Sequence, residues 1–241
     1  MTAVDLHRTD LLNLRVLATR DLQAFLAELR DESPEFARDA IAQVLPELLY
    51  PYTQTAAELA AVMVEDLRAE SGKSGTFYAS ADVAPMTREA ADRRARWAVG
   101  ALVDQSLDSS LLTRLQGISD RIVFNGSRET VLDNTARDHV AYQRMAAPGC
   151  CEFCAMLASR GSIYTKETGQ RRGKGQTENK YHDNCKCVLT AIYPGTEVAE
   201  IAELEKKDFQ ARYDAAVKHA DGATDQKSVL AAMRELSKEN Q

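Results

Sequence analysis

All five cysteines of this 241-residue chain lie between residues 150 and 187, and the rest of the chain has none. A disulfide scaffold spreads its bridges over a small secreted domain, whereas thiols gathered in one segment of a chain without a secretion signal more often bind metal. The N-terminal residues carry acids and no apolar stretch followed by a cleavage site. The cysteine segment therefore predicts a metal centre in a protein made in the cytosol.

Two half-sites can be recognised in this segment. The first is a C-x2-C pair, whose spacing lets a tight turn direct two thiolates at one ion, and the second is an H-x-x-C-x-C run further along the chain. Thiolate together with imidazole favours zinc, and no haem or iron–sulfur spacing occurs. The candidate ligands are Cys151, Cys154, His182, Cys185 and Cys187. We expect Cys151, Cys154 and Cys185 to bind together with either His182 or Cys187, leaving Cys150 unused.

The zinc is expected to be structural. A catalytic zinc keeps one position open for water beside a general acid or base. Glu152 and Asp183 are close in sequence, but both fall in turns where acids commonly face solvent, and four soft ligands can close the shell. A zinc ion enclosed by four protein ligands stabilises the folded state of a sheet that has too few strands to bury a core of its own. The alternative is a disulfide-linked cluster, with Cys151 or Cys154 bridged to Cys187.

Helical periodicity dominates the first part of the chain. Ser33-Pro34 predicts a helix start, and Thr55 with Glu58 has capping-box spacing, which predicts a second start. Asp108 is expected to cap a short helix, and residues 118–135 to form another. An apolar stripe at three- and four-residue steps comprises Leu11, Leu14, Ala18, Leu22, Phe25 and Leu29. We place His7 and His219 on helix surfaces and Trp97 in the core.

The predicted fold is α+β and mostly α-helical. Residues 139–145, 162–165 and 187–193 are short β-prone runs bounded by glycine or proline, which predicts a small sheet. We divide the chain into a helical region at 1–119 with a loop or hinge at about 71–85, a Cys/His zinc module at 120–195 and a helical tail at 196–241.

Charge excludes some functions and locates one candidate surface. The formal net charge of −6 and pI of about 5.4 provide no global field for nucleic acid, and no stretch approaches the roughly 20 apolar residues of a membrane span. One glycine-containing loop has a local positive excess and could bind phosphates, such as those of DNA, or an acidic partner. Its basic residues are Lys166, Arg171, Arg172, Lys174, Lys180 and Lys186. A solvated loop without a partner is the alternative.

The sequences CEFCAMLASRGSIYT and KYHDNCKCVL resemble the C-terminal module of MuF-like minor head proteins of tailed phages. That signature pairs C-x-x-C with a downstream H-x-x-C-x-C, and it covers residues 120–195 here, less than a third of the chain. The resemblance implies a structural virion or procapsid protein, made in the host cytoplasm and associated with the portal vertex. It implies head assembly, with DNA packaging or ejection, and portal or major capsid protein as partners.

The resemblance implies no enzymatic activity. Some members carry fused toxin or protease regions, but the helical tail after residue 195 is too short for either. Two other functions remain open from the residues alone. One is a zinc-assisted nuclease or other hydrolase that uses the basic loop at 166–186 with Glu152 or Asp183, and the other is a cellular zinc adaptor. An open coordination site with metal-dependent cleavage would distinguish the hydrolase.

Overall fold

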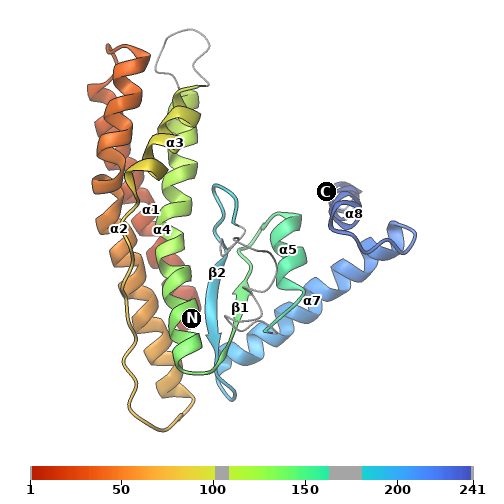
Figure 1. The fold of residues 1–241 in the computed structure, drawn as a ribbon. Coiled ribbons are helices and arrows are strands. Elements are labelled where there is room, and N and C mark those ends of the chain that lie inside the picture. The colour runs from red at the N-terminus through yellow and green to blue at the C-terminus, as the bar shows by residue number, and fades with distance from the viewer. Residues whose placement is uncertain (1, 101–108, 163–180, 240–241) are drawn as a thin grey trace.

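A computed structural model describes residues 2–100, 109–162 and 181–239. Within these ranges the chain is mostly helical and contains one two-stranded antiparallel sheet, which confirms the predicted fold class. Three long helices lie alongside one another, and the sheet lies beside one of them (Figure 1). The last two helices form an arm on the other side of the sheet.

Helices α1 (Ala3–Glu28) and α2 (Pro34–Glu70) begin at side-chain caps. The Thr2 hydroxyl accepts a hydrogen bond from the Asp5 backbone N–H, and the Asp5 side chain accepts from the Thr2 N–H, a reciprocal capping box. The Ser33 hydroxyl accepts from the Phe36 N–H, so α2 starts where the sequence predicts. The Ser-Pro signal works because proline at the first helical position loses no intrahelical hydrogen bond.

The predicted helix start at Thr55 is wrong, because α2 runs through it without a break. Pro46 and Pro51 lie inside this helix and remove two backbone donors. Further along the helix, the hydroxyls of Thr53 and Thr55 donate to the carbonyls of Leu49 and Pro51, each at 2.9 Å, one turn earlier. The hydroxyl that was expected to cap a new helix therefore bonds back into the old one.

Helices α3 (Arg88–Val99) and α4 (Ser109–Arg137) complete the bundle. The two helices expected between residues 108 and 135 are one helix, and Gly126 does not interrupt it because it lies where α4 meets α2. A Cβ at Gly126 would collide with the carbonyl oxygen of Thr53. The predicted cap Asp108 lies outside the described residues.

The bundle core is formed by the apolar faces of these helices. Leu11 and Leu22 of α1, Ile41 of α2 and Leu115 of α4 are fully or almost fully buried in one continuous cluster. These helices thus bury their apolar faces against one another, a driving force of about 25 cal/mol per Å² of apolar surface. Within the stripe predicted on α1, two members, Leu14 and Phe25, are only partly buried.

Two aromatic predictions for the bundle are wrong. His7 is 3% exposed, because its ring lies between α1 and α4 and its Nε2 is 2.7 Å from the hydroxyl of Ser127. Trp97 is 52% exposed and stacks with the Arg114 guanidinium, 4.9 Å from the ring centroid, instead of entering the core. The other predicted surface histidine, His219, is exposed and 3.0 Å from the Glu235 carboxylate.

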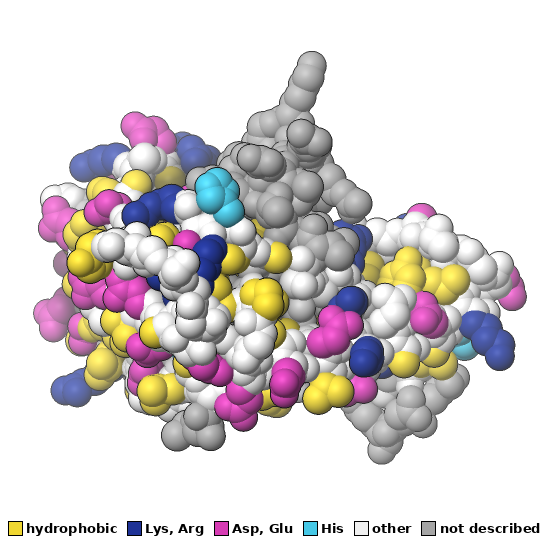
Figure 2. Space-filling view, turned by 90° about the horizontal axis from the view of Figure 1, so that it is seen from below, with side chains coloured by type: hydrophobic (Ala, Val, Ile, Leu, Met, Phe, Trp, Pro, Cys, Tyr) yellow, Lys and Arg dark blue, Asp and Glu magenta, His cyan; other side chains and the backbone are white. Residues whose placement is uncertain are grey.

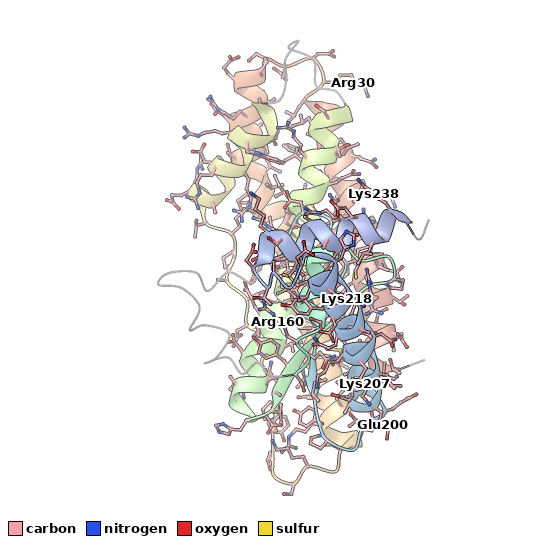
Figure 3. All side chains as sticks on the ribbon, turned by 90° about the vertical axis from the view of Figure 1, so that its right-hand side faces the viewer. Arg30, Arg160, Glu200, Lys207, Lys218 and Lys238 are labelled. Carbon is pink, nitrogen blue, oxygen red and sulfur yellow. The ribbon has the colours of Figure 1, made fainter. Side chains whose placement is uncertain are left out.

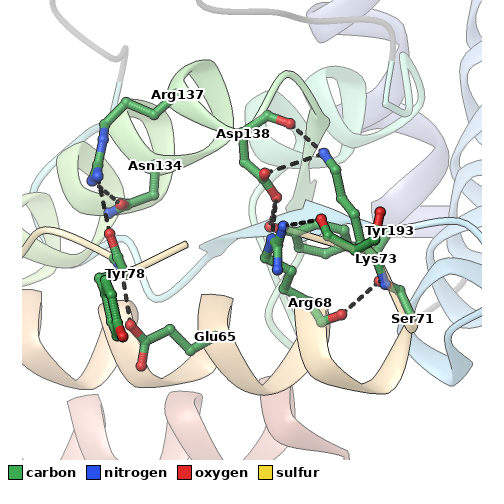
Figure 4. Close-up of polar contacts among 11 residues, drawn as sticks. Glu65, Arg68, Ser71, Lys73, Tyr78, Asn134, Arg137, Asp138 and Tyr193 are labelled. Carbon is green, nitrogen blue, oxygen red and sulfur yellow. Dashed lines mark hydrogen bonds and ion pairs between the residues drawn. The ribbon is translucent and has the colours of Figure 1, made fainter. Parts of the chain in front are cut away.

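The segment after α2 is a loop, and polar contacts tie it to α4 (Figure 4). Asp138, just beyond α4, accepts hydrogen bonds from Arg68 at 3.0 Å and from the Tyr193 hydroxyl at 2.7 Å. Lys73 lies 3.2 Å from the other carboxylate oxygen of Asp138. Near the middle of the loop, the Asn134 side chain bonds both the N–H and the carbonyl of Ser80. The loop is thus held along its length.

Strands β1 (Ala141–Met145) and β2 (Val188–Ile192) form the sheet. They pair antiparallel, with Ala141 opposite Ile192 and Met145 opposite Val188. Two of the three predicted β runs are therefore confirmed. Of the third run, 162–165, only Ser162 lies in the described residues, and it forms a turn. Helices α4 and α7 contact this sheet.

Helices α5 (Glu152–Ala158), α7 (Glu197–His219) and α8 (Gln226–Glu239) enclose a second, smaller core. Ala155 and Met156 of α5 pack there against Ala216 of α7 and Met233 of α8. The opposite face of α5 joins the main core through Cys154 and Ala158. This short helix therefore belongs to both cores.

The visible surfaces carry mixed charge. On the face in Figure 2, acidic side chains are interspersed with hydrophobic ones, and lysines and arginines occur in small groups. Figure 3 shows Glu200, Lys207 and Lys218 along α7 and Lys238 on α8. Among the described helices, none combines the length and apolar character needed to cross a bilayer.

Candidate metal centre

The sheet register brings the two half-sites together. Met145 at the end of β1 is opposite Val188 at the start of β2. The C-x2-C pair follows the end of β1, and the H-x-x-C-x-C run leads directly into β2, so both lie at the same end of the sheet. Segments about thirty residues apart in sequence thereby become neighbours.

The first half-site is formed by the start of α5, and not by a separate tight turn as predicted. Cys151 is the N-cap residue, and Cys154 lies three residues later on the same helix face. Cys154 is 1% exposed, whereas Cys151 is partly buried. The turn from Pro148 through Gly149, whose φ is +67°, redirects the chain from β1 into this helix.

In the second half-site, a hydrogen bond to the backbone orients the imidazole of His182. His182 Nδ1 is 2.7 Å from the carbonyl oxygen of Asp183. A carbonyl oxygen can only accept a hydrogen bond, so in the neutral ring Nδ1 carries the proton and Nε2 has the free lone pair. Nε2 points toward the first half-site, 3.1 Å from Cys151 Sγ and 3.8 Å from Cys154 Sγ. Hydrogen bonding at the other nitrogen is typical of metal-binding histidines.

The ligand atoms form two overlapping groups that share Cys154. One contains Cys151, Cys154 and His182, and the other contains Cys154, Cys185 and Cys187; the ligand atoms within each group lie within 4.8 Å of one another. Sulfur atoms 2.3 Å from a tetrahedral zinc lie about 3.8 Å apart. The Cys154–Cys185 sulfur separation is 3.5 Å, close to that value. This cluster can bind a metal ion.

All five cysteines are free thiols in the structure, so none of the disulfides considered from the sequence is formed. Cys187 Sγ accepts a hydrogen bond from the Ala147 N–H at 3.4 Å, which holds this thiol beside the β1 end. Cys150, expected to be unused, belongs to neither group of ligand atoms. Burial raises the pKa of the Cys150 thiol, which keeps it protonated.

Electrostatics separate the thiols of the second group. The hydrogen bond between Cys154 and Cys185 raises the pKa of Cys154 and lowers that of Cys185, where the nearby Arg128 also favours the thiolate. A thiolate is the form of cysteine that binds metal. Within this group, Cys185 is therefore the cysteine whose thiolate form is most favoured.

Two arginines and a tyrosine that the sequence reasoning missed support the cluster. Arg128 of α4 is fully buried and donates hydrogen bonds to the carbonyls of Cys185 and Cys187, at 2.9 and 2.8 Å. Arg144 of β1 donates to Cys154 Sγ at 3.5 Å. Both guanidinium groups lie over the Tyr181 ring. A sequence signal existed for Arg128, because it occupies the same helix face as the apolar residues Phe124 and Val131, where a solvated arginine does not belong.

The remaining predicted site residues supply no ligand atom to either group of this cluster or lie outside the described residues. Lys186 is described and exposed, and the other basic loop residues, Lys166, Arg171, Arg172, Lys174 and Lys180, lie outside the described residues. Asp183 forms an ion pair with Arg121 at 3.4 Å. Glu152 is the first residue of α5 and is partly buried.

Fold and site together define a mostly helical protein whose small sheet ends in a cluster of cysteine and histidine side chains suited to metal. A family model described as VG15 protein matches residues 1–238. The chain therefore belongs to the VG15 family, a phage-associated family of viral gene products. No curated protein and no solved structure is significantly similar to it.

Proposed function

We propose that this chain is a minor head protein of the MuF-like kind, a structural component of the phage particle associated with the portal vertex. Its role is in head assembly and in DNA packaging or ejection. One combined observation carries the proposal: a phage-associated family model covers nearly the whole chain, and the C-x-x-C and H-x-x-C-x-C elements of the MuF-like signature converge at one cluster.

The ion that suits this cluster is zinc, bound for structure and not for catalysis. Cys151, Cys154, His182 and Cys185 would hold it, with Cys187 as the fifth donor within reach. Zinc supplies cross-linking between the start of α5 and the start of β2, which a two-stranded sheet cannot provide by burial alone. Soft donors surround the position from two sides, which supports a closed shell without a water site.

The metal proposal is tested by elemental analysis of the purified protein and matched cysteine variants. Wild type should contain one zinc per chain, and Cys151→Ser and Cys185→Ser should lose both zinc and the folded state of residues 141–192. Cys150→Ser is the control, because this neighbouring thiol is outside both ligand groups and its loss should leave the zinc content unchanged. Folded, metal-free wild type would contradict the proposal. Metal-dependent DNA cleavage by wild type would favour a nuclease.

The proposed partners are the portal protein or the major capsid protein, inside the virion or procapsid. Most apolar stripe residues of the bundle are buried against one another, so the contact must use the apolar residues that stay exposed. On α1 the large apolar side chains that stay exposed are Leu6, Val16 and Leu17, with 52%, 63% and 48% of their surface exposed. Isolated exposed apolar residues are common, but three on one helix of this bundle form a candidate contact.

Purified particles test the assembly role. Mass spectrometry of phage heads should detect the protein at low copy number, and it should co-purify with the portal protein. Leu17→Lys should reduce incorporation, because burying an unpaired ammonium group in an interface is costly. Gln23→Lys is the control, since it adds the same charge at an exposed position of the same helix. Protein found only in the host cytoplasm would instead favour a cellular zinc adaptor.

The basic loop at 166–186 is proposed to face packaged DNA. Such binding is electrostatic and weakens steeply as salt increases, so a DNA-binding titration at several salt concentrations measures it. Replacing Arg171 and Arg172 by Gln should reduce both the affinity and its salt dependence. An unchanged affinity would show that this loop does not bind DNA.

A further inference from the structure

Tyr181, the residue before His182, lies between two guanidinium groups. The central carbon of Arg128 is 3.5 Å from the centroid of the tyrosine ring, and that of Arg144 is 3.8 Å from the same point. Each distance is the thickness of a stacked contact, so the two groups cannot share one face of the ring. They therefore lie on opposite faces, and Tyr181 separates two like charges.

Arg128 has no carboxylate partner among the described residues. Its hydrogen bonds go to the carbonyls of Cys185 and Cys187 and to the Asn125 side chain, all of which are neutral. Burying a charge without a counter-charge destabilises the folded state even after the structure relaxes, and neutral acceptors offset only part of this cost. Some nearby group must therefore be negative.

The cysteines are the groups placed to provide that charge. Arg144 donates directly to Cys154 Sγ in the first half-site. Arg128 holds the backbone on both sides of Lys186, which sets the positions of the Cys185 and Cys187 thiols in the second half-site. One guanidinium thus supports each half-site, and Tyr181 joins the two.

We propose that Arg128 and Arg144 are positioning residues of the zinc centre that act as its counter-charge, and that they select a ligand set with at least three thiolates. This inference rests on the proposed zinc site. Zinc with three thiolates and a neutral imidazole has a formal charge of minus one, and a fourth thiolate nearby makes it minus two. Two guanidinium groups compensate that charge from within the protein, Arg128 from a fully buried position and Arg144 from a partly buried one.

Arg144 offers the sharper test because it is only partly buried and, among the described residues, its substitution leaves no buried carbonyl without a donor. Zinc affinity is measured by competition with a chelating dye on full-length, zinc-loaded protein. Arg144→Gln should bind zinc about 10–100-fold more weakly, the range expected for loss of an outer partner of a metal ligand. Arg144→Lys, which keeps the charge, should restore most of the affinity.

Arg114→Gln is the matched control. This arginine also stacks on an aromatic ring, that of Trp97, and donates to the Trp97 carbonyl; none of its hydrogen bonds or ring contacts among the described residues involves a cysteine, so its loss should leave zinc affinity unchanged. Equal weakening by Arg144→Gln and Arg144→Lys would show that shape matters and charge does not, which overturns the inference. Unaltered affinity in Arg144→Gln overturns it as well, while the zinc site itself stands. Absence of zinc from wild type would overturn both proposals.

Discussion

Acid should destabilise the bundle through one buried histidine. Burial of His7, helped by the charge of Arg8, lowers the pKa of its imidazole from 6.5 to about 4. Between pH 6.5 and 4 the unfolded chain therefore binds a proton on His7 that the folded chain does not bind. The stability due to the neutral ring is fully present above pH 6.5 and is lost as the pH falls toward 4.

The size of this loss follows from the two pKa values. A shift of one unit corresponds to 1.36 kcal/mol, so the difference between 6.5 and about 4 amounts to about 3 kcal/mol of unfolding free energy. That is a large share of the roughly 5–15 kcal/mol typical of a folded domain. The ring also has little to gain from protonation, since Nδ1 is buried and no described group accepts from it.

Urea unfolding of wild type and His7→Gln at pH 7, 5.5 and 4.5 tests this reasoning. Glutamine can still bond the Ser127 hydroxyl but cannot titrate in this range. Acid also protonates carboxylates and metal ligands, but these contributions are common to both proteins and cancel in the difference. The wild-type free energy should fall relative to that of His7→Gln by about 2–3 kcal/mol across this range. A difference that stays constant with pH would refute the assignment of the proton to His7.

Three further outcomes are expected. Asp138→Asn should lower the free energy of unfolding, measured by chemical denaturation, by about 3–5 kcal/mol, because it removes the charge that pairs with two cations at a buried position. Asp39→Asn, at an exposed ion pair, should lower it by less than about 1 kcal/mol. Gly126→Ala should destabilise the fold by about 1–3 kcal/mol, measured in the same way, because the new methyl group meets the Thr53 carbonyl where α2 and α4 approach. Chelation of the proposed zinc should increase hydrogen exchange in α5 and α8 while leaving α1 and α2 protected; uniform exchange along the chain would contradict this.

The cysteine cluster could be anticipated because cysteine is rare and its confinement is visible without a structure. The Ser33-Pro34 start could be anticipated for a similar reason, since the signal is local and its mechanism requires no tertiary contact. The Thr55 prediction failed because a hydroxyl can bond forward as a cap or backward to the preceding turn, and packing of a continuous α2 against α4 decided between them.

Residues that act through tertiary contacts were harder to find. Arg128 and Arg144 come from a helix and a strand that the sequence does not show to be neighbours, and their role emerges only when both reach Tyr181. The sequence predicts a surface position for His7, because histidine on an amphipathic helix is usually solvated. Its burial depends on Ser127, 120 residues away, which provides a small polar partner on α4.

The position of the short helix α5 affects the order in which parts of the chain can fold during synthesis. The ribosome completes α1 to α4 before it synthesises Cys185, so these helices can begin to pack together while the second half-site, and the β2 residues that complete the same core, do not yet exist. The last two helices dock on α5, and with zinc as the proposed ligand α5 is fixed only after the chain has captured its ion. Host zinc supply would then limit how fast the carboxyl-terminal third matures, independently of how well the bundle folds.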